Sequence, residues 1–128
     1  MEKNNHVIGK RRWAIAEGYI PKTSHGDSRE MTSHEAICIL NADGQEAHVE
    51  VILYFTDREP VGPYKFTIAP RRSLHIRMND LQDPAPVPKG TEYSSLIVSD
   101  IPVVVQHSRL DSRQAENALM TTIAYSES

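Results

Sequence analysis

Polar side chains that could bind a small ligand are concentrated in one stretch near the C-terminus of the 128-residue chain. The stretch carries amide, imidazole, guanidinium and carboxylate groups on Gln106, His107, Arg109, Asp111, Arg113, Gln114, Glu116 and Asn117. Such planar groups offer paired donors and acceptors to a sugar-like ligand, often beside an aromatic face that Trp13 or Tyr19 could supply. The alternative interpretation is structural, with Arg109, Asp111 and Arg113 in ion pairs that hold a turn or a subunit contact.

Nucleophilic and metal chemistry find little support in the residue spacing. Ser108 follows His107 directly, but neighbours on a strand point to opposite faces, and the sequence contains no Gly-x-Ser-x-Gly elbow. The candidate metal ligands, which lack a tight spacing such as His-x-His, are His34 with Glu35, His75 and His107. We therefore expect no catalytic residue, no metal site and no cofactor.

Acidic pairs and basic doublets also have structural explanations. The acidic pairs flank predicted turns, where carboxylates commonly cap backbone donors; they are Asp57 with Glu59 and Asp80 with Asp83. In a basic doublet on a strand, the two side chains would point to opposite faces; the doublets are Arg11-Arg12 and Arg71-Arg72. Arg71 is expected to end a hairpin. With 14 basic and 17 acidic residues, the net charge of −3 argues against a dedicated nucleic-acid binder.

Length and composition indicate one globular domain. Hydrophobic residues make up 39% of the chain and charged residues 24%, which excludes a disordered acidic tail. The single cysteine, Cys38, lies in an apolar run and is expected to be a buried, reduced thiol. No apolar stretch approaches the ~20 residues that a membrane-spanning helix needs, so we expect a soluble, cytoplasmic protein that is not inserted in a membrane.

Apolar residues recur with period two along most of the chain, which is typical of half-buried β-strands. The clearest run is His48–Phe55, in which Val49, Val51, Leu53 and Phe55 would share one face. The other predicted strands are Trp13–Ala16, Glu35–Leu40, Tyr64–Ile68, Leu74–Met78, Tyr93–Val98, Pro102–His107 and Leu119–Tyr125. Roughly eight short strands predict an all-β protein, an antiparallel β-sandwich or jelly-roll-like barrel.

Turn signals separate these strands. Asp43-Gly44 is typical of a tight hairpin, and a second turn is expected at Glu59–Pro63. The remaining loops are expected at Pro21–Ser33, at the proline-rich stretch Asp83–Gly90, and at 111–118, where a single helical turn is the alternative. The predicted organisation is an N-terminal tail at 1–11, one β-sandwich domain at 12–125 and a C-terminal tail at 126–128.

Four stretches, spread in order over nearly the whole chain, resemble the soluble sensory-rhodopsin transducer family. They are Trp13–Pro21, Glu59–Tyr64, Asn79–Pro86 and Val105–Leu119. The resemblance implies a β-sandwich that assembles as a homotetramer and has no enzymatic activity. It also implies signalling, in the founding case from a membrane photoreceptor, and membership in a wider group proposed to bind small molecules such as sugars.

The two most distinctive of these stretches also concentrate polar and aromatic groups. We expect one ligand pocket lined by Trp13, Glu17, His107, Arg109, Asp111 and Arg113, because arginine offers a rigid fork to oxygen atoms and tryptophan can stack on a ring. The predicted function is a non-enzymatic signalling protein that binds a small polar ligand and relays its signal by protein contact, with a membrane photoreceptor or another receptor as partner. The alternatives are a structural oligomeric scaffold and a carbohydrate-active enzyme, which would need two acids across a cleft.

Overall fold

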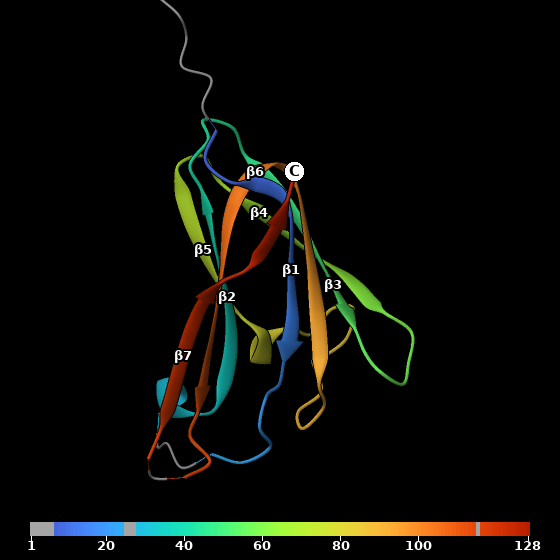
Figure 1. Cartoon of the computed structure of the whole chain (residues 1–128), viewed down its shortest axis with the longest axis vertical. Helices are drawn as coiled ribbons and strands as arrows, with labels where there is room; N and C mark the ends of the chain where they lie inside the picture. Colours follow the sequence, from blue (N-terminus) through green and yellow to red (C-terminus); the bar gives the residue numbers. More distant parts are fainter. Residues whose placement is uncertain (1–6, 25–27, 115) are drawn as a thin grey trace, which may run out of the picture.

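The computed structural model describes residues 7–24, 28–114 and 116–128, and these are built almost entirely from β-strands (Figure 1). The eight strands are β1 (Lys10–Gly18), β2 (His34–Asn41), β3 (Ala47–Tyr54), β4 (Val61–Ile68), β5 (Arg72–Arg77), β6 (Tyr93–Asp111), β7 (Ala118–Ile123) and β8 (Tyr125–Glu127). Two 3-10 helices, η1 (Arg29–Met31) and η2 (Met78–Asp80), complete the elements. None of the described helices has the length and apolar character that crossing a bilayer requires.

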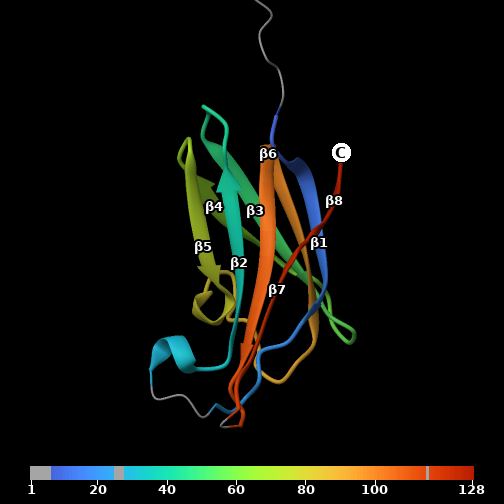
Figure 2. The same ribbon diagram turned by 60° about the vertical axis from the view of Figure 1, so that its left-hand side comes forward.

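All eight strands join one antiparallel sheet, which folds into two layers at β6 (Figures 1 and 2). The first arm of β6 pairs with β3 and β1, in a layer ordered β4-β3-β6-β1-β8. The second arm pairs with β2 and β7, in a layer ordered β5-β2-β6-β7. The predicted antiparallel sandwich is confirmed.

The core lies between the layers and follows the period-two pattern. In β3, the buried positions Val49, Val51 and Leu53 alternate with exposed or half-buried ones. They pack against buried residues of the opposite layer, such as Ile37 and Ile39 of β2. Alternation along each strand therefore gives the sandwich its apolar interior.

Three strand predictions need correction. Tyr93–Val98 and Pro102–His107 are the two arms of the single strand β6. Pro102 lies at an irregularity in the pairing with β1, between the pairs Arg12–Val98 and Lys10–Val103. Because no ladder hydrogen bond is needed there, the missing N–H of proline does not end the strand. The predicted strand Leu119–Tyr125 is divided instead, since β7 pairs with β6 and β8 pairs with β1.

The Asp43-Gly44 turn does not form a hairpin, which is a further correction. It carries the chain from β2 in one layer to β3 in the other, and Asn41 ties it to the end of β4 by donating from Nδ2 to the carbonyl oxygen of Ile68 at 3.1 Å. Arg71, with a φ of 55°, likewise turns the chain between layers rather than within a hairpin.

The predicted loop Pro21–Ser33 contains the short 3-10 helix η1. β3 and β4 form the hairpin predicted around 59–63. Between β6 and β7, the described residues 112–114 and 116–117 are not helical, and Ala115 lies outside the described residues. Residues 1–6 of the predicted tail and 25–27 of the predicted loop also lie outside them.

Candidate functional site

A buried carboxylate, that of Glu35, organises the interior of the sandwich. Its Oε1 accepts hydrogen bonds from Nε2 of His107 at 2.7 Å and from the hydroxyl of Tyr93 at 3.3 Å. Its Oε2 accepts from the backbone N–H of Tyr19 at 3.0 Å and from Nε of Arg109. Each oxygen therefore has two donors, which is what a charged group needs to be stable out of water.

Strand geometry explains how these groups meet. Residues 107 and 109 share the inner face of β6, and Glu35 faces them from β2, where it pairs in register with Arg109. Neither Glu35 nor Tyr93 was among the predicted ligand-binding residues. The alternation along β2 could have pointed to Glu35. It lies two residues before Ile37 and four before Ile39 and so shares their inward face, where a charged residue is unexpected.

The environment shifts the pKa values of the buried acidic groups. Burial by itself raises the pKa of Glu35, but the hydrogen bonds from His107, the Tyr19 backbone and Arg109 outweigh it and bring the pKa below its usual value. Burial, followed by the nearby charge of Glu35, raises the pKa of Tyr93 well above its usual range. Glu35 is thus held ionised and Tyr93 neutral.

Arg109 also lines a cleft beside this cluster. Its Nη2 atom is buried and has no hydrogen-bond partner among the described residues. The cleft has a volume of about 260 Å³ and lies between β1 and the C-terminal strands. We call it the β1/β7 cleft; its lining includes Ala14–Glu17, His107, Arg109, Met120 and Thr122–Tyr125.

Three of the six predicted ligand-binding residues, Glu17, His107 and Arg109, therefore line one cleft. Trp13 does not share it, because its side chain is only 5% exposed and packs in the core. The indole N–H donates to the carbonyl oxygens of Lys10 at 2.9 Å and Val103 at 3.1 Å. The aromatic ring at the cleft is that of Tyr125 instead.

Asp111 and Arg113 lie farther along, at the connection between β6 and β7. Oδ2 of Asp111 accepts from Nη2 of Arg113 at 2.6 Å, and this hydrogen bond, with the charge of Arg113, holds the pKa of Asp111 below its usual value. Both residues line a separate hollow of about 390 Å³, and the guanidinium of Arg113 lies 5.9 Å from the Tyr19 ring centre. Their pairing within a turn matches the structural alternative for these two residues.

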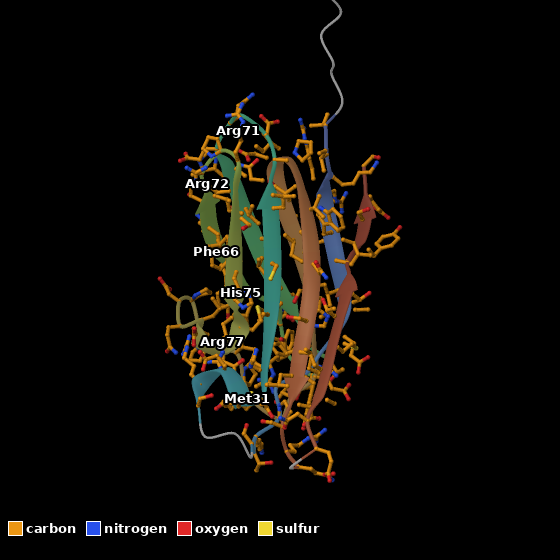
Figure 3. The ribbon with its side chains drawn as sticks, turned by 90° about the vertical axis from the view of Figure 1, so that its left-hand side faces the viewer. Met31, Phe66, Arg71, Arg72, His75 and Arg77 are labelled. Carbon is orange, nitrogen blue, oxygen red and sulfur yellow. The ribbon has the colours of Figure 1, made fainter. Side chains whose placement is uncertain are left out.

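The histidines considered as metal ligands lie on different faces. His107 and Glu35 point into the sandwich. His34 and His75 instead border a groove of about 730 Å³ on the outer surface of the layer formed by β5, β2, β6 and β7. Figure 3 looks onto this surface and labels Met31, His75 and Arg77 along it. Within the part of the chain that the structure describes, no three His, Cys, Asp or Glu side chains are grouped as metal ligands would be.

Comparisons with known proteins identify the family to which this chain belongs. The family model described as Anabaena sensory rhodopsin transducer matches residues 8–126. The solved structure of Thermotoga maritima 1070 is 38% identical with a TM-score of 0.84, over 94% of this chain and 97% of that one. A structure of the Anabaena sensory rhodopsin transducer is 56% identical with a TM-score of 0.74, over 84% of this chain and 94% of that one. The comparison with curated proteins found no match. The chain belongs to the Anabaena sensory rhodopsin transducer family.

Proposed function

We propose that this protein is a non-enzymatic, cytoplasmic signalling protein that binds a small polar, sugar-like ligand in the β1/β7 cleft. In this proposal the ligand, or a membrane photoreceptor or other receptor, changes the contacts that the protein makes with its partners. Membership in a transducer family supports the signalling role. The proposed working form is a homotetramer, as the family resemblance implies.

The observation that carries the ligand proposal is the incompletely paired guanidinium of Arg109, a residue that lines the cleft. One side of its guanidinium is fixed by Glu35, while the buried Nη2 has no partner among the described residues. A buried charged donor without a partner is costly, and an oxygen of a bound ligand is a suitable acceptor for it. Glu17, Thr122 and Tyr125 add an acceptor, a hydroxyl and an aromatic ring to the same cleft.

The chemistry of the cluster favours binding over catalysis. The lone pairs of Glu35 are occupied by four donors, so its carboxylate is a poor general base. His107 uses Nε2 to donate to Glu35, and Ser108 points to the opposite face of β6, where it pairs in register with Thr121. The cleft is smaller than the ~300–1,000 Å³ typical of drug-sized ligands, which suits a compact metabolite.

The test is a thermal-shift screen with sugars, nucleotides and organic acids, followed by calorimetry of each hit. Arg109→Lys keeps a positive charge beside Glu35 but removes the second N–H arm of the guanidinium. Glu17→Gln replaces the charged carboxylate at the cleft with a neutral amide. We expect each variant to bind the hit at least roughly tenfold more weakly, as for a lost charged hydrogen bond. Glu59→Gln, an exposed acid in the β3–β4 turn, is the matched control and should bind like wild type.

The outcomes separate the functional classes. Equal affinity of wild type, Arg109→Lys and Glu17→Gln would place the ligand elsewhere. Absence of saturable binding to every compound in the panel would favour a structural scaffold. Chemical conversion of the bound compound would favour a carbohydrate-active enzyme.

A further inference from the structure

Glu17 lies in a β-bulge of β1 and lines the β1/β7 cleft. Between the pairs Ile15–Ser95 and Gly18–Tyr93, β1 contains one residue more than β6 does. An extra residue of this kind bends the strand and changes the direction of the neighbouring side chains, and such bulges are frequent beside active sites. The Glu17 side chain is exposed to solvent. The bulge therefore presents a carboxylate to any molecule that enters the cleft.

Glu17 also carries the uncompensated charge of the cleft. The two basic residues of the lining, His107 and Arg109, both pair with Glu35 in the interior of the sandwich. Glu17 forms no ion pair with any of the residues that the structure describes. A concave surface with one free negative charge attracts a cation, so charge complementarity favours a ligand with a positively charged group.

The buried end of the cleft requires a different group from the ligand. Nη2 of Arg109 is buried without a partner among the described residues, so the ligand should offer an oxygen acceptor there. Glu35 already places a negative charge at Nε of the same guanidinium. A ligand carboxylate would add a second negative charge beside Glu35, whereas a hydroxyl oxygen accepts the hydrogen bond without adding charge. The cleft therefore combines a site for a cation with a site for a hydroxyl group.

We propose that the ligand of the β1/β7 cleft is an amino sugar, with its protonated amine at Glu17 and a ring hydroxyl at Nη2 of Arg109. This inference rests on the proposed function, for which it names the class of ligand. The ring of Tyr125 is 65% exposed, and its hydroxyl donates to Oε2 of Glu127 at 2.9 Å. The ring face is thus free to stack on the apolar face of a sugar. The volume of about 260 Å³ suits one monosaccharide unit.

Calorimetry with four related sugars tests the inference. Glucosamine carries the amine, glucose and N-acetylglucosamine are neutral, and glucuronate carries a carboxylate. At about pH 6.5, where the amine of glucosamine is protonated, we expect glucosamine to bind roughly tenfold more tightly than the two neutral sugars. Glucuronate should bind most weakly, because its charge has the same sign as those of Glu17 and Glu35.

Substitutions of Glu17 assign this preference to its charge. Glu17→Gln keeps an acceptor of the same size, so it should lower the affinity for glucosamine roughly tenfold and that for glucose by less than about twofold. Glu17→Lys reverses the charge and should make glucuronate bind more tightly than glucosamine. Glu59→Gln, in the exposed β3–β4 turn, is the matched control and should keep the wild-type order of affinities. Thermal unfolding of each variant verifies that it is folded.

The outcomes separate this inference from the proposed function. Equal binding of glucosamine and glucose, or a glucosamine preference that persists in Glu17→Gln, would overturn the amino-sugar inference alone. The same holds if none of the four sugars binds while another compound of the screen binds through Arg109. Absence of Arg109-dependent binding for every compound of the screen would overturn both the amino-sugar inference and the proposed ligand site.

Discussion

Nε2 of His107 lies 2.7 Å from Oε1 of Glu35, and both side chains are almost completely buried. An imidazole and a carboxylate in the core of a small β-sandwich are costly unless each is satisfied. Tyr93, Arg109 and the Tyr19 backbone complete the donors to this carboxylate. The stability of the fold therefore depends on a polar cluster as well as on the apolar core.

Removing the central carboxylate should destabilise the protein strongly. Glu35→Ala leaves the Arg109 guanidinium without its carboxylate partner, so we expect the free energy of unfolding to fall by about 3–5 kcal/mol. Urea denaturation followed by circular dichroism measures this change. Glu59→Ala removes an exposed acid and should change stability by less than about 0.5 kcal/mol. Equal effects of the two substitutions would contradict the importance of the cluster.

The lowered pKa of Glu35 predicts a loss of stability in acid. The folded state holds this proton less tightly than the unfolded chain, so the stabilisation is complete above the unfolded pKa of about 4.3 and is lost as the pH falls through the folded value. In Glu35→Gln the free energy of unfolding should depend less steeply on pH in this acidic window. The remaining slope would come from exposed acids with lowered pKa values, such as Asp80 and Asp111. Identical slopes in wild type and Glu35→Gln would show that Glu35 does not titrate as inferred.

Gly18 is required by the close approach of a buried ring. A Cβ atom at this position would lie 2.5 Å from Cε1 of Tyr93, which is packed in the core and cannot move aside. Gly18→Ala should cost about 1–3 kcal/mol of stability. Gly44→Ala is the matched control, because the nearest atom is 3.4 Å away at the end of the exposed Arg71 side chain. A smaller loss for Gly18→Ala than for Gly44→Ala would contradict this packing.

Trp13 should act as a structural residue. Trp13→Phe removes the donor to the Lys10 and Val103 carbonyl oxygens, and we expect a loss of about 1–3 kcal/mol. Circular dichroism is the measurement, since Trp13 is the only tryptophan in the chain. The affinity for a ligand of the β1/β7 cleft should stay unchanged. A large loss of affinity with stability preserved would instead support the stacking role that the sequence suggested.

The residue pattern alone predicted the all-β class and the approximate positions of the strands, because period-two alternation is a local property of extended chain. Four stretches of residues were enough to predict the family, which the comparisons confirm. These inferences needed only neighbours along the chain.

Tertiary structure decided the contacts between distant segments. Glu35 meets Arg109 across 74 residues because β2 pairs with the second arm of β6, and no local pattern specifies that partner. Alternation likewise separates two faces of a strand without saying which one is buried. Trp13 turned toward the core, whereas the apolar residues Leu119 and Ile123 of β7 turned toward solvent, because β7 lies at the edge of its layer with β6 as its one neighbour in the sheet.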